Sequence, residues 1–218
     1  MLTNITIKNY STIKSATLKP RRVNVFIGEN GAGKTTLLDA VRQCFGPGLS
    51  GAQFGKFNDG RAIHWGTDHS PREIVNGTWL RNGSGTERQE SIQRVLDGYS
   101  GRTVSLDLPE TNLAPLLRKN IAESIAEERN DDSKGVNASQ YFIATHDLMI
   151  LETLYTKTHE DEFALFYVQK RGGVTTVHQI IGDDLDDTME QGYPFFQAEH
   201  IVNRSQKPSQ EPHSEERG

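Results

Sequence analysis

The segment Gly28-Glu29-Asn30-Gly31-Ala32-Gly33-Lys34-Thr35 has the G-x-x-x-x-G-K-T spacing of a P-loop. It lies between an apolar run at residues 23–27 and a helical pattern that begins near Lys34, which is the strand–turn–helix setting that the motif requires. Its glycines let successive backbone N–H groups point at phosphate oxygens, and the helix start adds partial positive charge. The segment predicts a nucleoside triphosphate site formed by Asn30, Gly31, Ala32, Gly33, Lys34, Thr35 and Thr36.

Polar residues at the ends of two later apolar runs could complete this site. Lys34 is expected to reach the β- and γ-phosphates, and the Thr35 hydroxyl is expected to ligate Mg²⁺. Asp107 ends the run 103–107 as a Walker B aspartate does, and would hold the same metal ion. His146 ends the next run, where its imidazole could contact the γ-phosphate or the attacking water. Asp107 could also be an ordinary strand-end aspartate and His146 a structural histidine; the P-loop favours the functional interpretation of both.

The hydrophobic pattern predicts an α/β fold that brings these residues together. Ile5 and Ile7 alternate with polar residues, as do Ala16 and Leu18, which indicates an antiparallel pair of strands. Further strands are expected at 23–27, 103–107 and 141–145, with a hairpin formed by 163–169 and 174–180. Helices are expected after the P-loop, at 87–97, at 148–154, and after an N-cap at Asn112. We therefore predict a P-loop NTPase fold: a mostly parallel sheet flanked by helices, with an N-terminal antiparallel portion.

Composition indicates a cytoplasmic protein without a membrane partner. Among its 218 residues there is one cysteine, and the formal net charge is −5. No signal peptide or long apolar stretch is evident, and the charge argues against broad nucleic-acid coating. The basic pairs 21–22 and 118–119 could contact nucleic acid or partner carboxylates, although isolated basic pairs are most often solvated surface. We expect one domain at 1–202 with a reduced helical subdomain at about 48–100, followed by a disordered tail at 203–218.

The order of these motifs resembles that of the RecF/SMC/OLD-type ABC ATPases. Residues 5–10 and 25–38 resemble the start of these proteins, and 106–115 resembles their Walker B and D-loop pattern, L-D-E-P-E-x-x-L-H-P. Ala144-Thr145-His146 resembles their switch histidine. Residues 82–89 resemble a signature loop of the form L-S-x-G-x-x-R, which adds Ser84 and Gly85 to the expected nucleotide contacts. The family serine aligns with Gly83 unless Ser84 takes its role by a one-residue shift.

The resemblance implies an ATPase that uses ATP and Mg²⁺. Its members form head-to-tail, ATP-dependent homodimers, in which the P-loop of one copy faces the signature loop of the other. Such a dimer or higher oligomer usually drives a separate effector protein. Family members act in DNA repair, chromosome organisation or defence against phage, so the resemblance implies an ATPase subunit in DNA maintenance or antiphage defence.

One departure from the family pattern concerns hydrolysis. Leu108 occupies the position of the glutamate that polarises the attacking water, and leucine cannot accept a proton. Glu110 is the nearest substitute base, although it matches a different family position and could instead be a carboxylate at the start of a helix. We therefore assign Asp107, Glu110 and His146 as the catalytic candidates. A non-hydrolysing, ATP-gated assembly module is the alternative function; a transporter ATPase subunit is less favoured, because little chain separates the P-loop from the signature-like loop.

Overall fold

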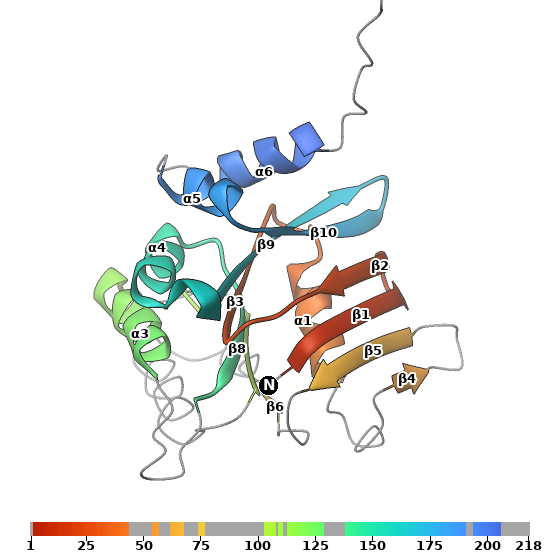
Figure 1. The fold of residues 1–218 in the computed structure, drawn as a ribbon, viewed down its shortest axis with the longest axis horizontal. Coiled ribbons are helices and arrows are strands. Elements are labelled where there is room, and N and C mark those ends of the chain that lie inside the picture. The colour runs from red at the N-terminus through yellow and green to blue at the C-terminus, as the bar shows by residue number, and fades with distance from the viewer. Residues whose placement is uncertain are drawn as a thin grey trace, which may run out of the picture.

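A single sheet passes through the part of the protein that the computed structural model describes, which comprises residues 2–43, 54–56, 62–67, 74–76, 103–107, 109–110, 113–128, 138–190 and 194–205. Within these residues the sheet has ten strands in the order β4-β5-β1-β2-β10-β9-β3-β8-β7-β6 (Figure 1). The strands are β1 (Leu2–Tyr10), β2 (Ile13–Leu18), β3 (Val23–Ile27), β4 (Phe54–Lys56), β5 (Ala62–Thr67), β6 (Ile74–Asn76), β7 (Thr103–Asp107), β8 (Gln140–Ala144), β9 (Phe163–Arg171) and β10 (Val174–Ile180). The helices are α1 (Lys34–Gln43), α3 (Pro115–Glu127), α4 (Leu148–Lys157), α5 (Asp183–Glu190) and α6 (Pro194–Ser205), with a 3₁₀ turn at Glu160–Glu162.

The centre of the sheet is parallel. Strand β3 lies between β8 and β9 and runs parallel to both, and β7 and β6 continue this direction. Strands β1 and β2 form the predicted antiparallel pair, and β5 and β4 extend it in antiparallel fashion. The register places Asp107 beside Ala144, and Ala144 beside Phe26. The carboxyl ends of β3, β7 and β8 therefore meet at one edge of the sheet.

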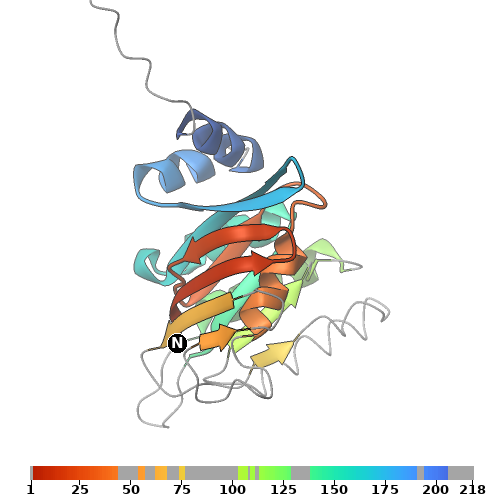
Figure 2. The same ribbon diagram turned by 90° about the vertical axis from the view of Figure 1, so that its right-hand side faces the viewer.

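Helix α1 lies between the antiparallel N-terminal strands and the central strands (Figures 1 and 2). It contributes Leu37, Leu38 and Val41 to the enclosed core. The two β layers contribute, among others, Ile5, Ile7, Ile13, Leu18, Phe26, Phe142 and Phe166. Because α1 is covered by apolar side chains from both layers, its first turn is fixed at the edge where β3 ends.

Helices α3, α4, α5 and α6 cover the opposite face (Figure 1). Strand alternation separates the two cores: Val23, Val25 and Ile27 of β3 face these helices, whereas Phe26 faces α1. Coverage on both faces explains why β3 is fully buried and apolar except at Asn24, whose side-chain amide donates to the Arg21 and Tyr141 carbonyl oxygens. No helix within the described ranges is long and apolar enough to span a membrane.

Several predicted elements match the structure. Strand β7 has the predicted bounds, and β9 and β10 form the predicted antiparallel hairpin. Its turn consists of Gly172 and Gly173, whose φ values of +54° and +79° favour glycine. The predicted N-cap at Asn112 is wrong: α3 begins at Pro115, and the residue before it, Ala114, makes no side-chain capping bond. A proline at the first helical position has no N–H to satisfy, so it starts the helix instead.

Other elements were not assigned from the sequence. Strands β4, β5 and β6 fall within residues 48–100, and β5 pairs along β1. The helix predicted at 87–97 lies outside the described residues, as do Ser84, Gly85 and Leu108. Helix α6 continues through Asn203 to Ser205, into the stretch predicted as tail, while 206–218 lies outside the described residues.

Arg22 closes the carboxyl end of α3. Its guanidinium donates to the carbonyl oxygens of Ile125 (2.9 Å) and Ala126 (3.0 Å), and its Nε bonds Glu162 at 2.8 Å. Donors from outside the helix are needed here, because the last four C=O groups of an α-helix lie beyond its regular hydrogen-bond pattern. The side chain of Arg22 is only 3% exposed. Arg22 is therefore committed to the fold and cannot serve as the nucleic-acid contact considered from the sequence.

We expect Arg22→Ala to destabilise the protein by about 1–3 kcal/mol, because it removes the hydrogen bonds that a buried guanidinium makes to the end of α3 and to Glu162. The matched control is Arg21→Ala, whose guanidinium makes an exposed bond to the Glu160 carbonyl and should cost little. Chemical denaturation of the two variants measures the difference. Equal midpoints would show that the cap contributes nothing to stability.

Candidate functional site

The P-loop adopts a backbone that only glycine tolerates at two positions. Gly28 has φ +144°, and a Cβ placed there would lie 2.0 Å from the carbonyl oxygen of Val168 on β9. Gly33 has φ +109°, and its Cβ would lie 2.6 Å from the hydroxyl oxygen of Thr175 on β10. Such distances are well below van der Waals contact. At Gly28 and Gly33 the main chain of the loop therefore packs directly against the β9–β10 hairpin, with no room for a side chain between them.

A hydroxyl from β10 supports the loop. Thr175 Oγ1 donates to the carbonyl oxygen of Ala32 at 2.9 Å and lies 2.8 Å from Thr12 Oγ1. Since its proton goes to Ala32, the Thr12 hydroxyl is the donor in the second bond. Sequence analysis predicted the hairpin but not this contact, because nothing in the local pattern says which strand lies beside the P-loop.

Lys34 lies inside the loop. Its Nζ donates to the carbonyl oxygens of Gly28 (2.8 Å) and Glu29 (2.9 Å). Burial lowers its pKa from 10.5 to about 8, against the opposing influence of the Asp107 and Glu110 carboxylates. An ammonium held here by main-chain oxygens is a ready partner for anionic oxygen atoms.

Thr35, on the first turn of α1, is hydrogen-bonded to Asp107 at the end of β7. The Thr35 hydroxyl donates to Asp107 Oδ2 at 2.9 Å, and Asp107 is 3% exposed. A hydroxyl and a carboxylate at one place are the hard oxygen ligands that Mg²⁺ prefers, and Mg²⁺ takes its remaining ligands from phosphate and water. The donor set thus fits Mg²⁺.

These side chains converge on a cavity of about 250 Å³. Its lining consists of Asn30, Gly31, Gly33, Lys34, Thr35, Thr36, Asp107 and His146. Of the residues predicted to hold phosphate, Ala32 is absent from this lining, since its carbonyl oxygen turns to Thr175. The cavity joins a buried cation, a carboxylate and open backbone turns, which is the chemistry that polyphosphate with Mg²⁺ requires.

His146 reaches the cavity as a half-buried side chain. Its pKa is lowered, first by burial and then by the charge of Lys34, while Glu110 and Asp107 act in the opposite direction. A lowered pKa favours the neutral ring at neutral pH. The neutral ring offers one N–H donor and one acceptor nitrogen.

The Glu110 carboxylate is hydrogen-bonded to the segment that follows β8. Its Oε2 accepts from the Thr145 hydroxyl and its Oε1 from the main-chain N–H of His146, both at 3.0 Å. It does not line the cavity. It also lies ahead of α3, so it is not within the first turn of that helix. Neither sequence interpretation of Glu110 anticipated these partners.

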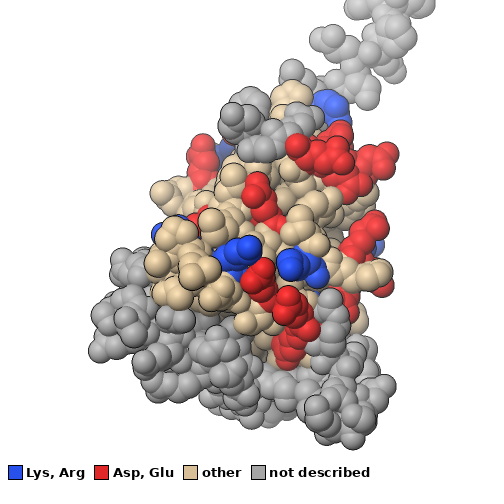
Figure 3. Space-filling model, turned by 90° about the vertical axis from the view of Figure 1, so that its left-hand side faces the viewer, with Lys and Arg blue, Asp and Glu red and all other residues tan. Residues whose placement is uncertain are grey.

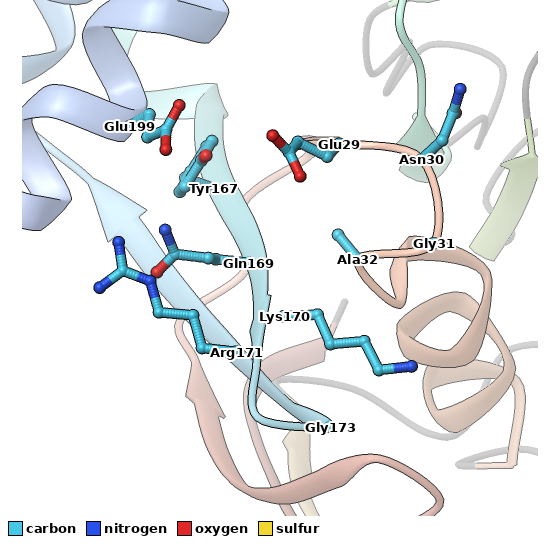
Figure 4. A pocket seen from close by; sticks show the side chains of 10 residues that line it. All are labelled: Glu29, Asn30, Gly31, Ala32, Tyr167, Gln169, Lys170, Arg171, Gly173 and Glu199. Atoms are coloured by element: carbon cyan, nitrogen blue, oxygen red, sulfur yellow. The ribbon is translucent and has the colours of Figure 1, made fainter.

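A second cavity, of about 430 Å³, lies on the other side of the P-loop (Figure 4). Glu29 from the loop and Glu199 from α6 point toward Tyr167 of β9 (Figure 4). Burial, together with these two carboxylates, raises the pKa of Tyr167 to about 12. Although this cavity is larger, neither Lys34, Asp107 nor His146 lines it. The side chains suited to polyphosphate and Mg²⁺ therefore gather at the smaller cavity.

Comparisons with known proteins agree with the fold. The family described as AAA domain matches residues 4–201. No curated protein sequence matches significantly. The SMC head bound to the C-terminal winged-helix domain of ScpA is similar, with a TM-score of 0.50 and 13% identity over 85% of this chain and 99% of that one. The SMC head domain from Thermotoga maritima gives 0.47 and 14% over 83% and 99%. The ATP-binding cassette MJ1267 of an ABC transporter, in its ADP conformation, gives 0.48 and 16% over 91% and 98%.

The family match covers most of the chain and includes the P-loop, Asp107 and His146. The sheet order and the strand-end site described above have the P-loop arrangement that the sequence resemblance led us to expect. The chain therefore belongs to the AAA domain family, and its fold is that of a P-loop NTPase.

Proposed function

We propose that this protein binds ATP with Mg²⁺ in the cavity between the P-loop, Asp107 and His146, dimerises around the nucleotide, and drives or gates a separate effector. One observation carries the proposal. Lys34 and Thr35 on the first turn of α1, Asp107 at the end of β7, and His146 just after β8 line a single cavity. A structural role alone gives no reason for a buried lysine, a buried aspartate and a histidine to converge there.

Each side chain has a defined task in this proposal. Lys34 and the P-loop N–H groups bind phosphate, and Thr35 and Asp107 hold Mg²⁺. Bound Mg²⁺ would neutralise charge on the phosphate oxygens. His146, neutral at physiological pH, donates or accepts a hydrogen bond at the far end of the same cavity. None of these residues supplies the carboxylate base that Leu108 replaces, so hydrolysis should be slow.

Exposed apolar side chains support dimerisation with a second copy of this chain. Leu116, at the start of α3, is 67% exposed, while Leu148 and Met149, at the start of α4, are 36% and 39% exposed. Both helix starts lie at the strand-end edge that carries the site, since α3 and α4 follow β7 and β8. An apolar patch beside a nucleotide site suits an interface that closes over the nucleotide. In the proposed dimer, Ser84 and Gly85 of the partner copy complete the site.

A direct role for nucleic acid has weaker support. On the face over α3 and α4, Lys and Arg are interspersed with Asp and Glu (Figure 3). There Glu123 lies 3.9 Å from Lys119 and 3.7 Å from Lys157. Arg118 is bound to Asp147 within the fold. We therefore propose that any link to DNA repair or antiphage defence runs through the effector.

Nucleotide binding is tested at Lys34. Loss of a charge-assisted contact costs about 1.5–3 kcal/mol, so Lys34→Ala should weaken ATP affinity by about 10- to 100-fold. Lys170→Ala is the matched control, because Lys170 lines the larger cavity on the other side of the P-loop. Calorimetric titration with Mg-ATP measures both. A loss of affinity in the Lys170 variant alone would move the site to the larger cavity.

Dimerisation is tested by exchanging the exposed apolar residues. The double variant Leu116→Ser/Met149→Ser should weaken ATP-dependent association by about 10-fold or more, because burying one such side chain contributes about 1.5–3 kcal/mol. Ile181→Ser is the control, since Ile181 is 63% exposed but lies after β10. Light scattering with and without Mg-ATP gives the mass. A mass that never depends on nucleotide would contradict the dimer.

The two candidate functions differ in phosphate release. We expect slow release from the natural chain and a rise of about 10²- to 10⁴-fold for Leu108→Glu, which restores a carboxylate base. Leu108→Gln has nearly the same shape but cannot take a proton, so it should stay slow. Thermal unfolding checks that each variant is folded.

Brisk phosphate release by the natural chain, unchanged in both variants, would show that position 108 does not limit hydrolysis. If no phosphate is released while ATP-dependent dimerisation is intact, the non-hydrolysing gate is favoured.

A further inference from the structure

The segments that follow β7 and β8 are joined by a set of hydrogen bonds at Glu110. The Thr145 hydroxyl donates to Oε2 and the His146 main-chain N–H donates to Oε1, each at 3.0 Å. Thr145 Oγ1 in turn accepts from the N–H of Asp147 at 3.0 Å. The carboxylate therefore binds Thr145 and His146 directly, and Asp147 is connected to it through the Thr145 hydroxyl.

A second connection closes these contacts into a ring. Asp147 Oδ2 accepts from Arg118 Nη1 at 2.6 Å, and Arg118 Nε donates to the Leu113 carbonyl oxygen at 2.8 Å. The Leu113 N–H then donates to the carbonyl oxygen of Glu110 at 3.1 Å. The ring runs from Glu110 through Thr145, Asp147, Arg118 and Leu113 back to Glu110. We call these five residues the strand-end ring.

The ring constrains the His146 main chain from both sides. Asp147 is also the N-cap of α4, since its Oδ1 accepts from the Ile150 N–H at 2.9 Å. His146 thus lies between a residue bonded to Glu110 and a residue fixed to the helix start. The backbone that carries the imidazole is thus held at the phosphate cavity, which His146 lines.

We propose that Glu110 is a positioning residue that holds the His146 imidazole over the phosphate-binding cavity, and that it is not a general base. Both of its oxygens accept hydrogen bonds from the His146 segment, and it does not line the cavity. A carboxylate used in this way holds another group in the geometry that phosphate contact requires. The inference rests on the proposed nucleotide site.

The ring also links two parts of the molecule. Its Arg118–Leu113 side belongs to the start of α3, beside exposed Leu116. Its Thr145–Asp147 side carries His146. A displacement of the α3 start by a partner therefore moves the His146 segment with it, because the two are bonded at both ends of the ring.

The experiment compares the affinities for a non-hydrolysable ATP analogue and for ADP, each with Mg²⁺. If Glu110 acts through His146, Glu110→Ala should weaken analogue binding by roughly 3- to 10-fold, the value of one hydrogen bond, and leave ADP binding unchanged. Unchanged ADP affinity also shows that the variant is folded. Glu123→Ala is the matched control, since Glu123 lies on α3 and pairs only with surface lysines in the contacts described above.

A double-mutant cycle makes the test specific. Glu110→Ala combined with His146→Ala should bind the analogue no more weakly than His146→Ala alone, because both remove the same contact. Glu110→Gln keeps an acceptor, so it should bind the analogue more tightly than Glu110→Ala. Additive losses in the cycle, or an unchanged analogue affinity in Glu110→Ala, would overturn the inference.

The remaining outcomes separate the inference from the proposed function. If the natural chain binds neither the analogue nor ADP, the proposed function fails and the inference fails with it. If the natural chain binds both ligands, and Glu110→Ala keeps the same ratio of analogue affinity to ADP affinity as the natural chain, only the inference fails. Should Glu110→Ala not fold, Thr145→Val replaces it, because that change removes one arm of the contact while nearly conserving shape. The same loss of analogue affinity is then expected.

Discussion

The P-loop can leave β3 only because residue 28 has no side chain. The Val168 carbonyl of β9 occupies the space that a Cβ would need, at 2.0 Å. This contact brings the loop onto the sheet and sets where α1 begins, and α1 is then held between two β layers. Lys34 and Thr35 stand on the first turn of that helix. Their position at the cavity therefore follows from one close approach of main chain to main chain.

The parts of this fold that the sequence predicted are those with strong local patterns. The P-loop, the buried runs that became β7 and β8, and the glycine turn of the hairpin each carry their signal within a few residues. The Asn112 cap failed because Pro115 supplied a competing helix start of its own. Strands β4 to β6 are three to six residues long in a polar stretch and gave no usable periodicity.

The candidate site was predicted by residue type but not by contact. Asp107 and His146 were identified because parallel strands end at a common edge, which is a general rule. The partners of Glu110 could not be found in this way, since they depend on the register between β7 and β8 and on where α4 begins. Arg22 and Arg118 were misjudged for a similar reason. Each donates hydrogen bonds to acceptors far away in the sequence. The sequence around each arginine therefore does not distinguish it from an ordinary surface residue.

The Thr175 hydroxyl lies at the seam of two structural layers. Strand β10 pairs with β2 through Thr175 and Ile13, and the Thr175 N–H donates to the Thr12 carbonyl at 2.8 Å. Through Ala32 the same side chain holds the nucleotide-binding turn. One hydroxyl group thus contacts both the P-loop turn and the Thr12 side chain next to β2. Loss of this hydroxyl would therefore loosen the P-loop turn and the junction of β2 with β10 at the same time.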